Sequence, residues 1–150
     1  EGSGASIDAW HVCHTASGDD PRKKPNPGLL FEALELAGGV SPAEAVFIGD
    51  NARTDLPAGA AAGVGRVLVG TGYGEELLSW MKEQSLALPR TLTESQALPR
   101  CAPSEAVGGG VLFPCRFHES LAEAVDELLE LHERGGFTAE ALYALADDGR

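Results

Sequence analysis

Residues 45–55 read Ala-Val-Phe-Ile-Gly-Asp-Asn-Ala-Arg-Thr-Asp, and this stretch decides the predicted fold. Its short apolar run ends abruptly at Gly49-Asp50, which is typical of a buried parallel strand that delivers a carboxylate at its carboxyl end. Ligands of α/β proteins bind at that end of the sheet. Asp55 lies just before a helical pattern, and its side chain can turn back toward the same crevice while it caps that helix. The stretch therefore predicts two acids that face one site.

The sequence on both sides of this stretch alternates between strand and helix patterns. Asn26 is predicted to cap a helix that begins at Pro27, and Gly38-Gly39 to end it. The remaining predicted elements are strands at 7–13, 66–69 and 111–113, helices after Asp55 and over 74–83 and 119–132, and a last helix that Thr138 caps. Pro114 is predicted to end the strand at 111–113 or to place it at a sheet edge. This order predicts an α/β fold, a three-layer parallel sheet with helices on both faces.

Two of the predicted elements carry further expectations. In helix 119–132, the inward face is predicted to consist of Leu121, Val125, Leu128 and Leu129. His118, just before this helix, is interpreted as a surface or helix-end residue. Residues 85–110 are rich in Pro, Ser, Ala and Gly and lack sustained periodicity, so they are predicted to form an irregular loop or insertion.

Length and charge limit the classes of function. The chain has 150 residues, of which 43% are hydrophobic, which is enough for one domain with its own core. The formal net charge of -12 argues against a nucleic-acid partner, because binding the phosphate backbone requires a basic face. No apolar run approaches the length of a membrane span and no leader opens the chain, so no membrane contact and a cytoplasmic location are expected, with an organelle still open.

Several segments together resemble a known family. Residues 23–28 read Lys-Lys-Pro-Asn-Pro-Gly, and they precede Phe47-Ile48-Gly49-Asp50 and Asp55 at a separation similar to that in haloacid dehalogenase (HAD) superfamily phosphatases. Within that superfamily the chain resembles the branch of D-glycero-D-manno-heptose 1,7-bisphosphate phosphatase and histidinol-phosphatase. The similarity covers roughly residues 7–72, and residues 117–131 resemble the closing helix. The resemblance implies one HAD-like, Rossmann-like domain over 1–150.

The resemblance also implies an activity and the residues that perform it. Phosphatases of this family hydrolyse small phosphomonoesters with Mg²⁺, through an aspartyl-phosphate. By position, Asp50 would be a Mg²⁺ ligand, and Lys24 would neutralise the nucleophile and the transferring phosphoryl group. Asp55 would orient Lys24 or a metal-bound water. Lys23 and Asn51 would contact the substrate, a small phosphorylated metabolite such as a sugar phosphate or histidinol phosphate.

The sequence departs from the family pattern in its nucleophile. The family has an Asp-x-Asp segment at the end of a first strand, and residues 1–6, which begin with Glu1 instead of Met, contain nothing like it. The domain is therefore expected to be incomplete at its amino-terminal end, with its first strands missing. We expect the chain alone to be inactive, and a complementing chain could carry the missing strands.

A second departure concerns zinc. Members of this branch often bind a structural zinc ion in the loop before the Lys-Pro segment, and the chain retains only His11, Cys13 and His14 of that pattern. Since a thiolate zinc site needs four ligands, we expect the site to be degenerate and zinc binding to be lost. Three widely spaced cysteines, Cys13, Cys101 and Cys115, imply no disulfide framework.

Two other functions stay open. The chain could be a non-catalytic interaction or regulatory module that pairs an open sheet edge with another chain. It could also be a receiver-like phospho-acceptor, which uses a strand-end Asp, a Lys and Mg²⁺. That alternative is the weaker one, because the Lys of such a domain is expected after the acceptor, whereas Lys24 precedes Asp50.

Overall fold

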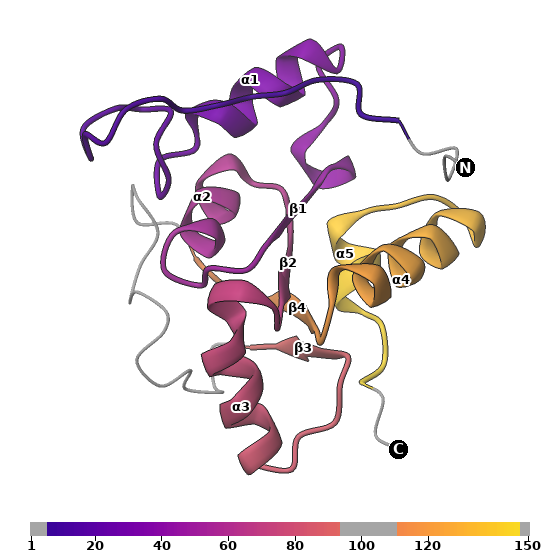
Figure 1. Cartoon of the computed structure of the whole chain (residues 1–150). Coiled ribbons are helices and arrows are strands. Elements are labelled where there is room, and N and C mark those ends of the chain that lie inside the picture. Colours follow the sequence, from indigo (N-terminus) through magenta and orange to yellow (C-terminus); the bar gives the residue numbers. More distant parts are fainter. Residues whose placement is uncertain (1–5, 94–110, 148–150) are drawn as a thin grey trace.

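The computed structural model describes residues 6–93 and 111–147, which form a four-stranded sheet with helices on both faces (Figure 1). The strands are β1 (Val46–Gly49), β2 (Gly65–Val69), β3 (Arg90–Leu92) and β4 (Cys115–His118), in the order β1-β2-β4-β3. β1, β2 and β4 run parallel, and β3 is antiparallel to β4. The predicted α/β fold is confirmed, although its sheet is mixed instead of wholly parallel.

Helices cover the two faces of this sheet. They are α1 (Gly28–Leu36), α2 (Asp55–Ala62), α3 (Glu75–Glu83), α4 (Leu121–Glu133) and α5 (Ala139–Tyr143), with 3₁₀ turns η1 (Pro42–Glu44) and η2 (Gly72–Gly74). Leu68 of β2 packs with α2 and α3, whereas Val67 and Val69 pack with α4 and α5. This alternation places one apolar cluster on each face. Within the described residues, no helix is long and apolar enough to cross a membrane.

The strand predicted at 7–13 is wrong. These residues form no strand in the structure, and they run as an extended segment beside α1 (Figure 1). His11 lies near α1, with its Nδ1 3.6 Å from Oε2 of Glu32. Ile7 and Trp10 are 65% and 79% exposed. The apolar residues of this segment therefore lack the neighbouring strand that would make them part of a sheet.

The prediction for residues 85–118 is wrong in two places. Pro114 precedes the strand instead of ending it, since β4 begins at Cys115 and lies between β2 and β3. A central strand tolerates this proline because its missing N–H falls before the ladder begins. The short edge strand β3 lies inside the stretch predicted to be irregular. Residues 94–110 of that stretch lie outside the described residues.

The predicted inward face of α4 and the predicted cap of α1 are wrong, whereas the predicted cap of α5 is confirmed. The packed face of α4 contains buried Ala124 with Leu128 and Leu131, whereas Leu121, Val125 and Leu129 are 54%, 38% and 56% exposed. Asn26 does not cap α1, because its amide donates to the carbonyls of Gly18 and Asp20. The cap at Thr138 is confirmed, since its hydroxyl accepts the N–H of Ala141 at 3.1 Å.

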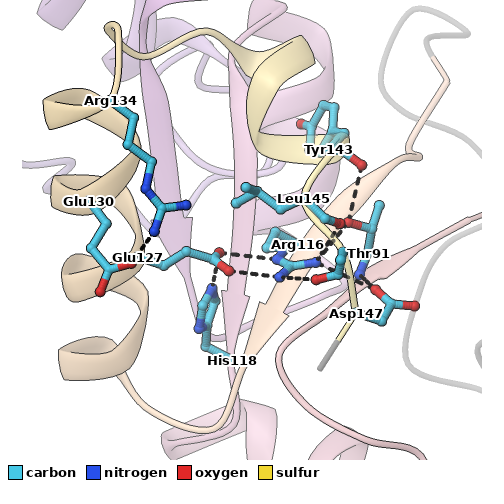
Figure 2. Close-up of polar contacts among 10 residues, drawn as sticks. Thr91, Arg116, His118, Glu127, Glu130, Arg134, Tyr143, Leu145 and Asp147 are labelled. Atoms are coloured by element: carbon cyan, nitrogen blue, oxygen red, sulfur yellow. Dashed lines mark hydrogen bonds and ion pairs between the residues drawn. The ribbon is translucent and has the colours of Figure 1, made fainter. Parts of the chain in front are cut away.

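A buried arginine joins β4 to the elements around it (Figure 2). Arg116 is 1% exposed, and its guanidinium donates two hydrogen bonds to the Glu127 carboxylate of α4, at 3.0 and 2.7 Å. It also donates to the Thr91 hydroxyl of β3 and to the carbonyls of Leu145 and Ala146 after α5. One side chain thus connects two strands, a helix and the segment after α5.

His118 belongs to the same network. It is 2% exposed, and its Nε2 lies 2.8 Å from Oε2 of Glu127. The interpretation of His118 as a surface residue is therefore wrong. Burial alone would raise the pKa of Glu127, but the hydrogen bonds and charges of His118 and Arg116 outweigh it and lower that pKa to about 2.

Replacing Arg116→Ala should strongly destabilise the fold. It leaves the Glu127 carboxylate without its guanidinium partner and removes the donors to the carbonyls of Leu145 and Ala146, so the free energy of unfolding should fall by about 3 kcal/mol or more. Urea denaturation measures this change. Arg134→Ala is the matched control, because the Arg134 side chain is 71% exposed and forms an ion pair with Glu130 one turn away. This change should cost under about 0.5 kcal/mol. Equal effects of the two changes would contradict the structural role of Arg116.

Glu127 should also make stability depend on acid pH. Its pKa falls from 4.5 to about 2 on folding, so its contribution is present above pH 4.5 and is lost as the pH drops toward 2. Urea midpoints of wild type and Glu127→Gln, compared across this range, should therefore converge as the pH falls. A constant difference between the two proteins would show that the charge of Glu127 does not matter.

Candidate active site

The candidate site lies where β1 ends and α2 begins, and it is organised by Asp55. This residue is buried, and its Oδ2 accepts the backbone N–H groups of Asp50 at 3.1 Å and Asn51 at 3.0 Å. Its Oδ1 accepts a hydrogen bond from Nζ of Lys24 at 2.5 Å. One carboxylate therefore binds both the turn after β1 and the lysine.

Gly49 makes this arrangement possible. A Cβ at this position would lie 2.4 Å from Oδ2 and 2.5 Å from the Cβ of Asp55, closer than atoms in proteins approach. The glycine at the end of β1 thus gives the Asp55 side chain the space to fold back under the strand. The Gly-Asp pair in the sequence reflects this close approach.

Lys24 reaches the site from the segment before α1. Arg22 attaches this segment to α1, because its Nη2 donates a hydrogen bond to Oε2 of Glu32 at 3.1 Å. The Lys24 ammonium also lies 5.8 Å from the ring centroid of Phe47 in β1, a distance at which a cation is attracted to the ring. Its side chain is 46% exposed, so the ammonium keeps access to a ligand.

The Asp50 carboxylate contacts the turn after β2. Its Oδ2 accepts the backbone N–H of Tyr73 at 3.1 Å. Gly72, at φ +57°, allows this contact, because a Cβ there would lie 2.3 Å from the same oxygen. A cavity of about 310 Å³ beside Asp50 is lined in part by Asn51 and Glu76. The structure thus joins Asp50 to Asp55 through the Asp50 backbone, and the sequence did not predict the role of Tyr73.

The two predicted substrate-binding residues, Asn51 and Lys23, each make a hydrogen bond within their own loop. Asn51 stabilises the turn after β1, since its Oδ1 accepts the N–H of Arg53 at 3.0 Å. Lys23 points to its own loop, and its Nζ donates to the carbonyl of Ala16 at 2.7 Å. Their contact with substrate stays a prediction.

A metal ion needs several donor side chains close together. Within residues 6–93 and 111–147, no three His, Cys, Asp or Glu side chains are placed to hold a metal ion together. Cys13 makes a contact of 3.9 Å to the carbonyl of Thr15. A Mg²⁺ ion, in contrast, is often held by one or two protein carboxylates, water and substrate phosphate. Asp50 fits such a site as one ligand among several.

The chain was compared with known proteins. Residues 21–94, about half of the chain, match the HAD-hydrolase-like family. A probable phosphoglycolate phosphatase of Pseudomonas savastanoi is 45% identical over 53 residues, which are 35% of this chain and 32% of that protein. A phosphoglycolate phosphatase of Pseudomonas putida is 44% identical over 54 residues, 36% of this chain and 18% of that protein. No solved structure matches the chain significantly.

These matches support the class that the fold and the Lys24–Asp55 pair indicate, a HAD superfamily phosphatase. The relatives are named phosphoglycolate phosphatases, so the heptose-bisphosphate and histidinol-phosphate branch stays a prediction. The matched segment spans about a third or less of the length of these relatives. The activity of these full-length relatives is therefore only proposed for this chain.

The site predicts a large effect of Gly49→Ala. The new methyl group would displace the Asp55 carboxylate, so we expect a loss of about 1–3 kcal/mol in the free energy of unfolding and faster hydrogen exchange at the Asp50 and Asn51 amides. Gly18→Ala is the control, since a Cβ there meets nothing within 4 Å. Wild-type exchange rates in Gly49→Ala would mean that Asp55 does not depend on this glycine.

Proposed function

We propose that the chain contributes to a Mg²⁺-dependent phosphatase of the HAD type that hydrolyses a small phosphomonoester through an aspartyl-phosphate. The observation that carries this proposal is the buried Asp55 carboxylate, which holds the exposed Lys24 ammonium beside the end of β1. This arrangement presents a positive charge at the carboxyl end of a parallel strand, where phosphate ligands of α/β proteins bind.

Each residue has a defined part in this mechanism. The Lys24 ammonium would donate to the phosphoryl oxygens and stabilise the charge that they carry in the transition state. Asp55 would position Lys24 without touching the substrate. Asp50 would supply one oxygen to a Mg²⁺ ion, which would neutralise further phosphoryl charge when bound. The nucleophile has to come from elsewhere, because the sequence contains no Asp-x-Asp segment.

The substrate class follows from the relatives and from the chemistry. Phosphoglycolate, the substrate in the names of the relatives, is a small phosphomonoester, as are sugar phosphates and histidinol phosphate. We propose this shared class, with the cytoplasm as the expected location. Lys23 and Asn51 are proposed to contact the substrate, and His11, Cys13 and His14 are proposed to have lost a zinc-binding role.

A second candidate function is a non-catalytic module derived from the same fold. It is favoured by the unpaired edge of β1, which is the terminal strand of the sheet in the described part of the chain. In this case the site residues would stabilise the turn after β1, and the chain would bind another protein.

The proposed metal site can be tested without turnover. Millimolar Mg²⁺ should shift the amide resonances of Asp50 and Tyr73 in NMR spectra of the chain, and Asp50→Asn should abolish the response because it removes the anionic ligand. Glu76→Gln is the matched control, since Glu76 lines the same cavity. If Mg²⁺ shifted the resonances of wild type and Asp50→Asn equally, Asp50 would not be a ligand of the metal ion.

Activity provides the complementary test. With Mg²⁺ and phosphoglycolate, the chain alone should release no more phosphate than Asp50→Asn. When the amino-terminal part of a phosphoglycolate phosphatase relative is supplied in trans, we expect release that requires Lys24 and Asp50. Turnover by the chain alone would show that it contains a nucleophile that we have not identified.

A further inference from the structure

The turn that follows β2 holds one of the two oxygens of the Asp50 carboxylate. Residues 70–74 read Gly-Thr-Gly-Tyr-Gly and contain the 3₁₀ turn η2. The backbone N–H of Tyr73 donates a hydrogen bond to Oδ2 of Asp50 at 3.1 Å. Within residues 6–93 and 111–147, the other oxygen, Oδ1, accepts no hydrogen bond. The two oxygens of this carboxylate therefore differ in what they can still bind.

Two glycines allow the turn to approach Asp50 this closely. Gly72 has a φ of +57°, which L side chains rarely adopt, and a Cβ there would overlap Oδ2 of Asp50. A Cβ at Gly74 would overlap the carbonyl oxygen of Val69, at the end of β2. The turn can therefore donate its N–H to the carboxylate because neither position carries a side chain.

A carboxylate with one oxygen engaged binds cations selectively. Asp and Glu carboxylates bind Ca²⁺ through one oxygen or through both, and Ca²⁺ takes many oxygen ligands in a flexible geometry. Mg²⁺ is smaller, demands octahedral geometry, and is held by one or two carboxylates while it keeps several waters. Because the N–H of Tyr73 competes for Oδ2, the Asp50 carboxylate offers a cation one oxygen. This arrangement suits Mg²⁺ better than Ca²⁺.

The cavity beside Asp50 favours the same cation. Its volume of about 310 Å³ has room for several water molecules, and Glu76 adds a second carboxylate to its wall. In the part of the chain that the structure describes, no three His, Cys, Asp or Glu side chains could hold a metal ion together. The donors of this cavity therefore fit a cation that keeps its own waters.

We propose that the turn at residues 70–74 is a metal-selectivity element. In this role, the N–H of Tyr73 restricts Asp50 to a single metal-binding oxygen and so disfavours Ca²⁺ relative to Mg²⁺. Tyr73 is a positioning residue that acts through its backbone, and its exposed ring has no part in the selectivity. This inference deepens the proposed function and rests on it, because it requires that Asp50 binds Mg²⁺.

Two substitutions of Tyr73 separate its amide from its ring. Tyr73→Pro removes the N–H in the first turn of a helix, where proline is tolerated, whereas Tyr73→Ala keeps the N–H. NMR titrations of the full chain, followed at the Asn51 amide, give the dissociation constants of Mg²⁺ and Ca²⁺. The ratio of the Ca²⁺ constant to the Mg²⁺ constant should fall about tenfold in Tyr73→Pro, as expected for one hydrogen bond to a charged group. It should keep its wild-type value in Tyr73→Ala.

A second variant tests the same contact without proline. In Gly72→Ala, the methyl group would displace Oδ2 of Asp50 from the N–H of Tyr73, so the ratio should fall here as well. Gly38→Ala is the matched control, because Gly38 also has a positive φ, +88°, and a Cβ there meets nothing within 4 Å. The control should keep the wild-type ratio, which separates the lost contact from the cost of the backbone conformation.

The outcomes distinguish a failure of this inference from a failure of the proposed function. If Mg²⁺ shifts no resonance of the wild-type chain, both are overturned. If Mg²⁺ binds and the ratio is unchanged in Tyr73→Pro and Gly72→Ala, the metal site stands and the selectivity role of the turn is overturned. An equal fall in Tyr73→Ala would assign the effect to the ring and also overturn it. A fall in Tyr73→Pro and Gly72→Ala, with both controls unchanged, supports the inference.

Discussion

The site depends on the hydrogen bonds that the buried Asp55 carboxylate accepts. It accepts two backbone N–H groups from the turn after β1 and the ammonium of Lys24, which lies 31 residues earlier in the chain. Because the carboxylate is buried, it would be costly without these partners, and the partners fix it in one orientation. The turn, the lysine and the first residue of α2 are therefore positioned together. The absence of a side chain at Gly49 is the steric condition for this arrangement.

The strands of the sheet differ in how many contacts their neighbours make with them. Around β4, the Arg116 network ties β3, α4 and the segment after α5 together, and every neighbour contributes an acceptor. Around β1, the contacts are fewer, and α1 has no buried residue. The polar site thus lies at the border between a well-packed part of the fold and a part with an uncovered apolar surface.

Local patterns predicted the parts of the fold that depend on local physics. The apolar run before Gly49-Asp50, the glycines after α1 and the cap at Thr138 all express short-range requirements, and the structure contains the corresponding strand, helix end and cap. The pairing of Lys24 with Asp55 followed from the family resemblance, since no periodicity connects positions so far apart.

Other features could not be read from the sequence because they depend on tertiary partners. Residues 7–13 alternate like a strand, but a strand forms only where a neighbour pairs with it. The burial of His118 and Arg116 depends on Glu127, which lies on the following helix and forms hydrogen bonds with both side chains. The exposed stripe of α4 has the same helical spacing as its packed stripe, so spacing alone selects the wrong face.

The alternation along β2 has a consequence for how this fold tolerates changes in length. Leu68 fills one apolar cluster, and Val67 and Val69 fill the other. A single inserted or deleted residue within β2 would turn the side chains beyond it to the opposite face of the sheet, so both clusters would lose residues at once. Natural variation in chain length should therefore be confined to the connections between elements, and β2 should keep a constant number of residues between its flanking glycines, Gly65 and Gly70.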